Sequence, residues 1–231
     1  MMHSSAKLDA VLFDFDGTLA ELTIDFDLMK RRIAAVASAL LERDVSPDGT
    51  PVLEWLDALE SSAPTSDLGK ELHSRGRLIV TATELEAAGH GKLFSFTRSV
   101  LDELARSGVK SGVITRNCTP AVLKVFPDLR DHCQVFLPRE DARKLKPDPG
   151  HLIQALHILG VEPDKVLMVG DHPMDVATAK SAGARSAAVW SGRTGPEDLA
   201  RMHPDYLAPD AADLLRQLKA LEILPKDNHI A

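Results

Sequence analysis

Short apolar runs recur along the chain, and each ends in or just before polar residues, glycine or aspartate. The runs have the length of strands and are rich in Val, Ile, Leu or Phe. Near-continuous apolar runs of this kind are typical of strands buried on both faces of a parallel sheet. The predicted strands are Leu8–Phe13, Lys110–Ile114, Gln134–Leu137, Lys165–Val169 and Ser186–Val189.

Apolar residues at helical spacing fill the intervals between these runs. They predict helices over Ser95–Ser107, Thr119–Phe126, Asp148–Leu159 and Pro173–Ala182. Strands that alternate with helices indicate βαβ units. The predicted fold class is therefore α/β, with a doubly wound, Rossmann-like parallel sheet.

The segment 20–92 interrupts this alternation, because it contains no clear strand-type run. Its apolar spacing predicts helices over Asp27–Leu41, Pro51–Leu59 and Thr65–Gly89. We expect residues 20–92 to form a helical domain inserted after the first strand. Residues 1–19 and 93–231 would then form the α/β core domain.

Composition and charge narrow the class of protein. The net charge of −7 argues against a broad nucleic-acid-binding surface, which needs a concentrated basic patch. Two cysteines in 231 residues do not suggest a disulfide framework, so they favour a reducing cytoplasm. Met1–Asp9 holds no apolar run that would serve as a signal peptide, and no stretch approaches the roughly 20 apolar residues of a membrane span. We expect a cytoplasmic protein with no nucleic-acid or membrane partner.

Residues suited to catalysis or ligand binding lie where predicted strands end. Open α/β sheets bind ligands at the carboxyl ends of their strands. The segments that follow four predicted strands are rich in groups suited to phosphate chemistry: Asp14–Leu19, Thr115–Asn117, Lys146–Pro149 and Gly170–Asp175.

These groups suit a metal ion and a phosphate together. Mg²⁺ takes oxygen ligands, often one or two carboxylates, which Asp14 and Asp171 could supply. A metal and Lys146 would offset the repulsion between an anionic nucleophile and an anionic substrate. Thr115 could donate its hydroxyl to a phosphate oxygen, and Gly17 permits a tight turn that brings backbone N–H groups near the same anion.

A carboxylate can also attack phosphorus and form an aspartyl-phosphate, which water then discharges. A second acid must protonate the leaving alcohol and later activate that water. Asp16, two residues after Asp14, can turn off the strand end to do this. The residues therefore favour Asp14 as the nucleophile and Asp16 as the general acid and base.

In this order, the four segments resemble the signature motifs of the haloacid dehalogenase superfamily. The insertion resembles that superfamily's helical cap of the first type, and the chain is similar to the phosphoglycolate phosphatase-like branch from Leu8 to about Leu218. The resemblance implies Mg²⁺-dependent hydrolysis of a small phosphate monoester through a phosphoaspartate. It implies a small phosphorylated metabolite as the partner, and it leaves the oligomeric state and the substrate's identity unspecified.

The resemblance also assigns catalytic roles by position. Asp14 is the nucleophile and a metal ligand. Asp16 is the general acid and base, and its backbone carbonyl binds the metal. Thr115 and Lys146 hold the phosphoryl group.

Four further residues are assigned to metal or substrate binding. Asp171 is a metal ligand, and Asp175 is a ligand or an outer carboxylate. Arg116 and Asn117 add substrate contacts.

The chain departs from the pattern in two places. His172-Pro173 stands where many relatives carry Ser or Thr and a small residue, and Ala20–Thr23 replaces the usual sequence after the first motif. The first departure concerns local hydrogen bonding, and the second concerns the entrance to the cap.

Simpler interpretations exist for each motif. An EF-hand loop starting at Asp14 would need Gly and Glu where Leu19 and Asp25 stand, and the preceding segment is strand-like. Thr115 alone would cap a helix. Asp171 and Asp175 alone would be an N-cap and a first-turn acid. Lys144 competes with Lys146, although Pro147 favours Lys146 by restraining its backbone.

Rival functions also remain open. A 2-haloacid dehalogenase lacks the second acid, so Asp16 counts against it. A β-phosphoglucomutase-like enzyme shares all four motifs. A phosphonatase-like enzyme would need a cap lysine, with Lys30 or Lys70 as candidates. A non-catalytic module that binds small anions would retain the fold alone. Basic residues of the insertion are candidate contacts to the substrate: Lys30, Arg31, Arg32, Arg43, Arg75 and Arg77.

Overall fold

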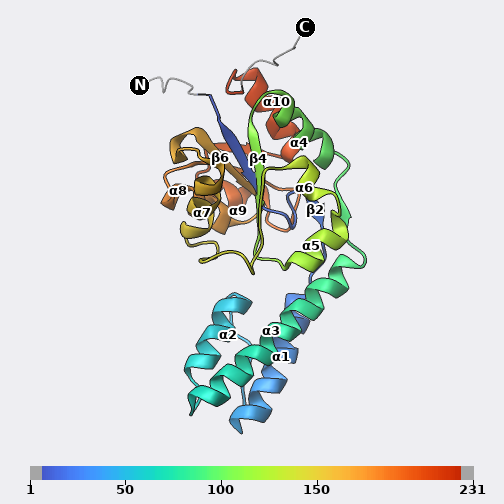
Figure 1. Ribbon diagram of the computed structural model, residues 1–231. Coiled ribbons are helices and arrows are strands. Elements are labelled where there is room, and N and C mark those ends of the chain that lie inside the picture. Colours follow the sequence, from blue (N-terminus) through green and yellow to red (C-terminus); the bar gives the residue numbers. More distant parts are fainter. Residues whose placement is uncertain (1–6, 225–231) are drawn as a thin grey trace. The chain divides into compact units, whose positions relative to one another are not determined.

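The computed structural model describes residues 7–224, which form two compact units (Figure 1). One is the helical unit Thr23–His90, and the other is an α/β unit built from the described residues on either side of it. Residues 20–22 and 91–92, predicted to belong to the insertion, group with the α/β unit. Residues 1–6 and 225–231 of the predicted core domain lie outside the described residues, as does most of Met1–Asp9.

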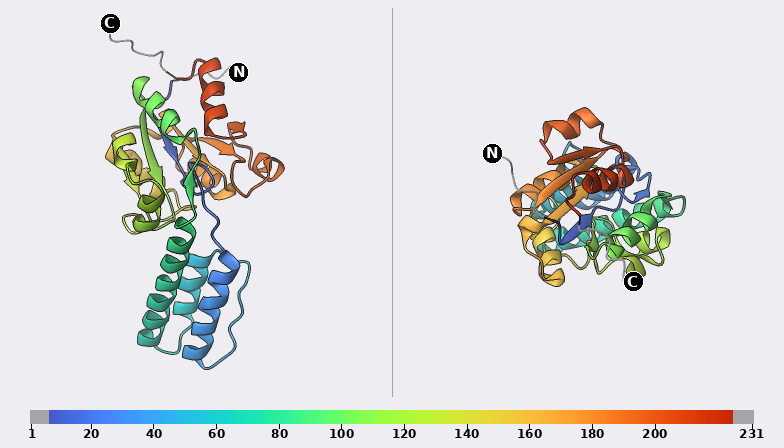
Figure 2. Two further views of the ribbon diagram at one scale, coloured as in Figure 1. Left: turned by 90° about the vertical axis from the view of Figure 1, so that its right-hand side faces the viewer. Right: turned by 90° about the horizontal axis from the view of Figure 1, so that it is seen from above.

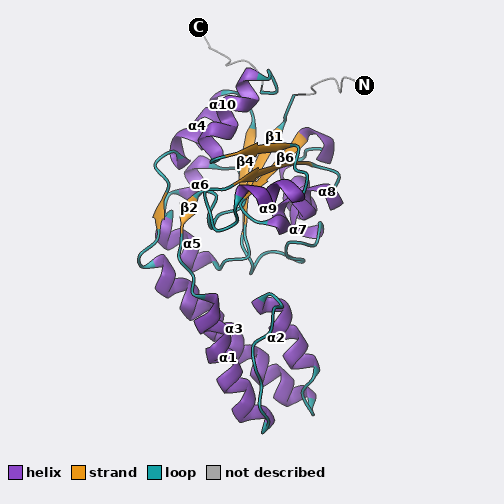
Figure 3. Cartoon of the chain, turned by 180° about the vertical axis from the view of Figure 1, so that it is seen from behind, coloured by secondary structure: helices purple, strands orange, loops and turns teal. Residues whose placement is uncertain are grey.

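The α/β unit is built on a parallel sheet, whose strands are drawn in orange in Figure 3. The sheet has six strands in the order β5-β4-β1-β6-β7-β8. The strands are β1 Ala10–Phe13, β4 Lys110–Ile114, β5 Val135–Leu137, β6 Val166–Gly170, β7 Arg185–Val189 and β8 Tyr206–Ala208. From β1 the chain adds β4 and then β5 on one side of the sheet. It then crosses to the other side of β1 and adds β6, β7 and β8 in turn. This reversal is the doubly wound arrangement, and it confirms the predicted fold class.

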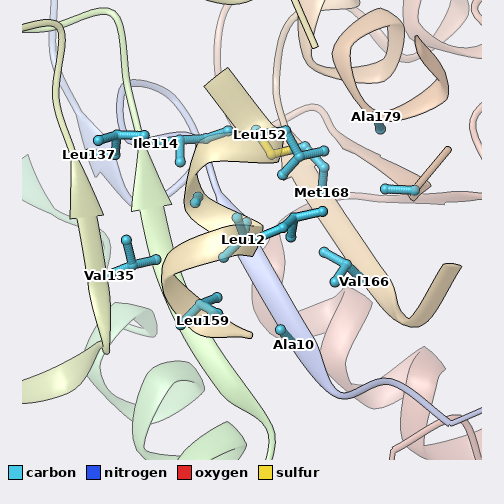
Figure 4. Close-up of a cluster of buried hydrophobic side chains, with 13 residues drawn as sticks. Ala10, Leu12, Ile114, Val135, Leu137, Leu152, Leu159, Val166, Met168 and Ala179 are labelled. Atoms are coloured by element: carbon cyan, nitrogen blue, oxygen red, sulfur yellow. The ribbon is translucent and has the colours of Figure 1, made fainter. Parts of the chain in front are cut away.

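Strand β1 is central because both of its faces are apolar and buried. Ala10 and Leu12 face one cluster, which includes Leu152 and Leu159 of α7 (Gly150–Leu159) and Ala179 of α8 (Pro173–Ser181) (Figure 4). Alternate residues of a strand point to opposite faces. Helices α7 and α8 therefore cover one face of the sheet.

The other face of β1 carries Val11 and Phe13. They line an apolar space with Val100 of α4 (Thr97–Arg106) and with Leu214 and Leu218 of α10 (Ala211–Ala220). Helices thus lie on both faces of the sheet (Figure 2). Burial on both sides explains why the strands read as continuous apolar runs.

The remaining elements of the α/β unit are short. They are α5 Thr119–Val125, α6 Leu129–His132, η1 Pro163–Lys165 and α9 Pro196–Arg201. A two-stranded antiparallel sheet pairs β2 (Ala20–Glu21) with β3 (Lys92–Leu93). This pairing, which the sequence did not predict, joins the two ends of the insertion within the α/β unit.

The helical unit contains α1 Phe26–Leu41, α2 Val52–Ser61 and α3 Ser66–Ala88. Asp25 and Thr65 cap α1 and α3, because their side chains accept hydrogen bonds from the backbone N–H groups of Leu28 and Leu68. Among the described residues, no helix has the length and apolar character needed to cross a bilayer.

Candidate active site

The sheet brings three of the predicted motifs to one edge. Phe13, the last residue of β1, pairs in register with Val113 of β4 and Val169 of β6. Asp14, Thr115 and Asp171 follow these strands, so they lie at neighbouring carboxyl ends. The order in which strands are added to the sheet reverses between β1 and β6. Open α/β sheets bind ligands at such a point.

Lys146 links two aspartates at this edge. Its Nζ atom lies 2.6 Å from Oδ1 of Asp14 and 2.8 Å from Oδ1 of Asp175. Lys146 is 1% exposed, whereas Lys144 is exposed to solvent. The structure therefore places Lys146, and not its neighbour, against the predicted nucleophile.

Burial and neighbouring charges both shift the pKa values of Asp14 and Lys146. Burial raises the pKa of Asp14 above its usual value; Lys146 lowers it, and the charge of Asp175 raises it further. Burial alone would lower the pKa of Lys146, but the charges of Asp14 and Asp175 outweigh that effect and raise it. The ammonium group therefore stays charged and stabilises the two carboxylates.

Asp171 completes a cluster of carboxylates with Asp14 and Asp175, whose ligand oxygens all lie within 4.8 Å of one another. Burial raises the pKa of Asp171 to about 8, and the charges of Asp14 and Asp175 add to this effect. Its Oδ2 accepts a long hydrogen bond of 3.3 Å from the backbone N–H of Arg193. Buried, crowded oxygen donors of this kind fit a hard divalent cation such as Mg²⁺. Asp14 and Asp171 are the two whose carboxylates would hold it.

The loop after β7 comes close to the carboxylate of Asp171 at Gly192. A Cβ atom at Gly192 would lie 1.8 Å from Oδ2 of Asp171, so any side chain there must displace the carboxylate. Gly192→Ala is therefore expected to weaken Mg²⁺ binding by about tenfold or more. The measurement is a Mg²⁺ titration followed by the midpoint of thermal unfolding. Gly195→Ala is the matched control, because a Cβ there meets nothing within 4 Å. Equal Mg²⁺ affinities in the two variants would contradict the placement of Asp171 as a ligand.

Asp175 accepts hydrogen bonds within the protein through both carboxylate oxygens. Oδ1 accepts from Lys146, and Oδ2 accepts from the backbone N–H of His172 at 3.1 Å. His172 Nδ1 in turn accepts from the N–H of Met174 at 3.1 Å, which completes a capping box at the start of α8. Burial lowers the pKa of His172, which favours the neutral imidazole that this acceptor role needs. His172 thus caps α8 as a Ser or Thr would, which accounts for one departure from the family pattern.

Asp16 lies on the tight turn that follows β1. Gly17 has φ +81°, and a Cβ there would lie 2.4 Å from Oδ2 of Asp171, so both backbone conformation and space require glycine. The side chain of Asp16 accepts a hydrogen bond from Nδ2 of Asn117. The structure therefore brings the first and second motifs into direct contact.

Thr115 and Arg116 occupy the loop after β4. The buried Thr115 Oγ1 accepts from the N–H of Asn117 at 3.0 Å, which leaves its own O–H proton for donation to a ligand. The guanidinium of Arg116 donates to the backbone carbonyl of Lys146. Arg116, predicted as a substrate contact, thus supports the loop that carries Lys146.

Two buried residues that the sequence did not single out support these loops. His151 is fully buried; its Nδ1 accepts from the N–H of Lys146 at 3.4 Å, and its Nε2 lies 3.1 Å from the carbonyl oxygen of Leu137. Arg139 donates to the carbonyl oxygen of Arg116 at 2.8 Å. Arg139 carries no sequence signal that separates it from a surface residue. His151 is in helical register with Ala155 and Leu159 on the buried face of α7, and this register is the signal that could have identified it.

His151 gives a pH-dependent prediction. Burial, followed by the charge of Lys146, lowers its pKa from 6.5 to about 4. A pKa that is lower in the folded state means that the stability contributed by neutral His151 is present above pH 6.5 and is lost as pH falls towards 4. Over this range the titration of His151 should cost the wild type up to ~3 kcal/mol of unfolding free energy. His151→Gln, which keeps a donor at the position of Nε2, should not show this loss. Urea unfolding at both ends of the range measures this difference, and identical losses in the two proteins would count against a buried neutral His151.

Two of the basic residues predicted as substrate contacts, Lys30 and Arg32, have partners within the helical unit. Nζ of Lys30 donates to the carbonyl oxygens of Asp48 and Thr50 at 2.7 and 2.6 Å. Arg32 pairs with Glu86 at 3.2 Å. Lys30 therefore ties a loop to α1, which argues against a Schiff-base role, and the contact of any of these residues with a substrate stays a prediction.

Comparison with known proteins identifies relatives of this chain and structures with its fold. The sequence pattern of haloacid dehalogenase-like hydrolases matches residues 11–189. N-acetylmuramic acid 6-phosphate phosphatase of Pseudomonas putida is 29% identical, over 83% of this chain and 87% of the relative. Phosphoglycolate phosphatase of Yersinia pseudotuberculosis is 29% identical, over 89% of this chain and 90% of the relative. The crystal structure of a hydrolase from Pseudomonas syringae has a TM-score of 0.68 and 20% identity, covering 92% of this chain and 99% of that one, and it shows the same fold.

Proposed function

The chain belongs to the haloacid dehalogenase-like hydrolase family, and from this membership we propose that it is a Mg²⁺-dependent phosphatase that hydrolyses a small phosphate monoester at Asp14. Relatives named as phosphatases of N-acetylmuramic acid 6-phosphate and of phosphoglycolate support the reaction class. They differ in substrate, so we propose the class of small phosphorylated metabolites and no single member.

The contact of Lys146 with Asp14, 2.6 Å between Nζ and Oδ1, carries the proposal. A buried ammonium held against a carboxylate at the switch point of a doubly wound sheet can neutralise an incoming phosphoryl group. Asp175 holds the other side of the same ammonium, which fixes its position. An ion pair with a purely structural role would not need the carboxyl groups of Asp171 and Asp16 nearby. Their presence therefore supports a catalytic role for the pair of Lys146 and Asp14.

The first half-reaction transfers the phosphoryl group to the enzyme. An oxygen of Asp14 bonds to phosphorus as the bond between phosphorus and the leaving oxygen breaks, and a proton passes from Asp16 to that oxygen. Lys146 and the hydroxyl of Thr115 bind the phosphoryl oxygens. A bound Mg²⁺ supplies positive charge that orients the phosphate and offsets its repulsion by Asp14.

The second half-reaction returns both aspartates to their starting states. The Asp16 carboxylate takes a proton from water as the water oxygen bonds to phosphorus and the bond from phosphorus to Asp14 breaks. Inorganic phosphate is released. We further propose that the helical unit is the cap domain that determines which phosphate ester is accepted.

Release of inorganic phosphate from a panel of phosphorylated compounds tests the proposal. The panel should hold phosphoglycolate, N-acetylmuramic acid 6-phosphate, hexose phosphates and p-nitrophenyl phosphate, each with Mg²⁺ and with EDTA. We expect release with Mg²⁺, loss with EDTA, and recovery when Mg²⁺ is returned. An isomerised hexose phosphate without free phosphate would favour a mutase. No reaction with any compound would favour a non-catalytic binding module, and resistance to EDTA would contradict the role of the metal.

A further inference from the structure

The side-chain amide of Asn117 lies against the carboxylate of Asp16. Its Nδ2 is 3.0 Å from Oδ1 and 3.1 Å from Oδ2 of Asp16. Asn117 is 2% exposed, whereas Asp16 is only partly buried. The contact joins the loops that follow two adjacent strands, β1 and β4, so it is a direct link between two motifs.

The orientation of the amide follows from its other partner. Oδ1 of Asn117 lies 2.7 Å from the backbone nitrogen of Cys118. A backbone N–H can only donate, so the amide oxygen must face it, and the amide nitrogen must therefore face Asp16. Both polar atoms of the Asn117 side chain thus have a partner within the protein.

The backbone of Asn117 is held as firmly as its side chain. Its N–H donates to Oγ1 of Thr115 at 3.0 Å, and its carbonyl oxygen accepts from the N–H of Arg139 at 3.2 Å. Asp16, in contrast, stands on the turn at Gly17. A rigid, buried donor can therefore fix the position of a partly exposed acid, because locked partners hold catalytic groups in productive geometry.

We infer that Asn117 is a positioning residue, which orients the carboxyl group of Asp16 for proton transfer and does not itself contact the substrate. The inference rests on the proposed function. In the first half-reaction, the proton on Asp16 passes to the leaving oxygen as its bond to phosphorus breaks and the bond from phosphorus to Asp14 forms. In the second, Asp16 takes a proton from water as the water oxygen replaces Asp14 on phosphorus. Both transfers need the same carboxyl position, which Asn117 sets.

The leaving group provides the test. An alkyl phosphate needs its leaving oxygen protonated, whereas p-nitrophenolate departs without a proton. The ratio kcat/KM reports the steps up to departure of the leaving group. In Asn117→Ala, we expect kcat/KM to fall by about tenfold or more for the best alkyl phosphate of the panel and by less than about threefold for p-nitrophenyl phosphate.

Two controls separate positioning from general disruption. Thr119→Ala removes a hydroxyl two residues after Asn117, at the start of α5, that is bonded to Glu140 and not to Asp16. It should leave the ratio of the kcat/KM values for the two substrates unchanged. In an Asp16→Asn background, Asn117→Ala should cause no further loss with the alkyl phosphate, because the group through which it acts is already gone.

Each outcome decides between interpretations. A fall of equal size for both substrates, or a full additional loss in the Asp16→Asn background, would overturn the inference and favour a substrate contact or a folding defect. Phosphate release by the wild type with no effect of Asn117→Ala would overturn the inference alone. Absence of release by the wild type from every substrate would refute the proposed function, and the inference with it.

Discussion

Asp14→Asn is expected to reduce phosphate release by about 10⁴-fold or more while the protein remains folded. The amide cannot attack phosphorus, so the loss should appear in kcat for every substrate that the wild type accepts. The fold should persist because Lys146 keeps Asp175 as a partner, 2.8 Å from Nζ. Steady-state kinetics and thermal unfolding, measured on the same preparation, test both statements.

The matched comparison for this variant is Asp171→Asn, which changes a carboxylate that Lys146 does not contact within hydrogen-bond distance. We expect its defect to be reduced in part by high Mg²⁺ concentrations, because the remaining ligands still provide a weakened site. No Mg²⁺ concentration should restore Asp14→Asn. Substantial activity in Asp14→Asn would remove Asp14 from the role of nucleophile.

Lys146→Met is expected to have the largest effect on stability. The side chain is 2% exposed, and its loss leaves the carboxylates of Asp14 and Asp175 buried without their common counter-charge. Breaking a buried ion pair by removing one partner typically costs about 3–5 kcal/mol of unfolding free energy. Phosphate release should also fall by about 10²–10³-fold, because the phosphoryl group loses a cationic donor.

Lys144→Met is the control for this change, since Lys144 is an exposed lysine two residues away. It should alter the unfolding free energy by less than about 0.5 kcal/mol and leave phosphate release intact. Urea unfolding of the two variants in the absence of Mg²⁺ gives the comparison. Similar unfolding free energies for both would mean that Lys146 does not stabilise the carboxylate cluster.

Much of the fold follows from apolar patterning, because the central strands are buried on both faces. The runs ending at Phe13, Ile114 and Leu137 were predicted with the ends observed. The pattern failed for three other strands. Two of the three residues of strand β8, Tyr206–Ala208, are only partly buried, whereas two of the three residues of β5 are buried. Strands β2 and β3 have two residues each, so their pairing depends on tertiary structure.

The site was predictable to the extent that function requires particular side chains after strand ends. Asp14, Thr115 and Asp171 come together because parallel strands share one carboxyl edge. The supporting residues could not be predicted in this way. Burial of Arg139 depends on how loops fold back on one another, and the sequence carries no periodic signal for that. His151 lies on the buried face of α7, in helical register with Ala155 and Leu159, but its contact with the backbone of Lys146 depends on the fold of the preceding loop. The contact between Asn117 and Asp16 likewise spans 101 positions.

The central claim is that phosphate passes through a covalent bond to Asp14. Asp16→Asn should slow discharge of this intermediate by water but still allow p-nitrophenolate to depart, so the phosphorylated protein should accumulate. The measurement is a rapid acid quench of Asp16→Asn with p-nitrophenyl phosphate and Mg²⁺, followed by peptide mapping. We predict a burst of about one p-nitrophenolate per active site and a hydroxylamine-sensitive phosphoryl group on Asp14. A phosphoryl group on another residue, or an active wild type whose Asp16→Asn variant gives neither burst nor modified peptide, would contradict the account.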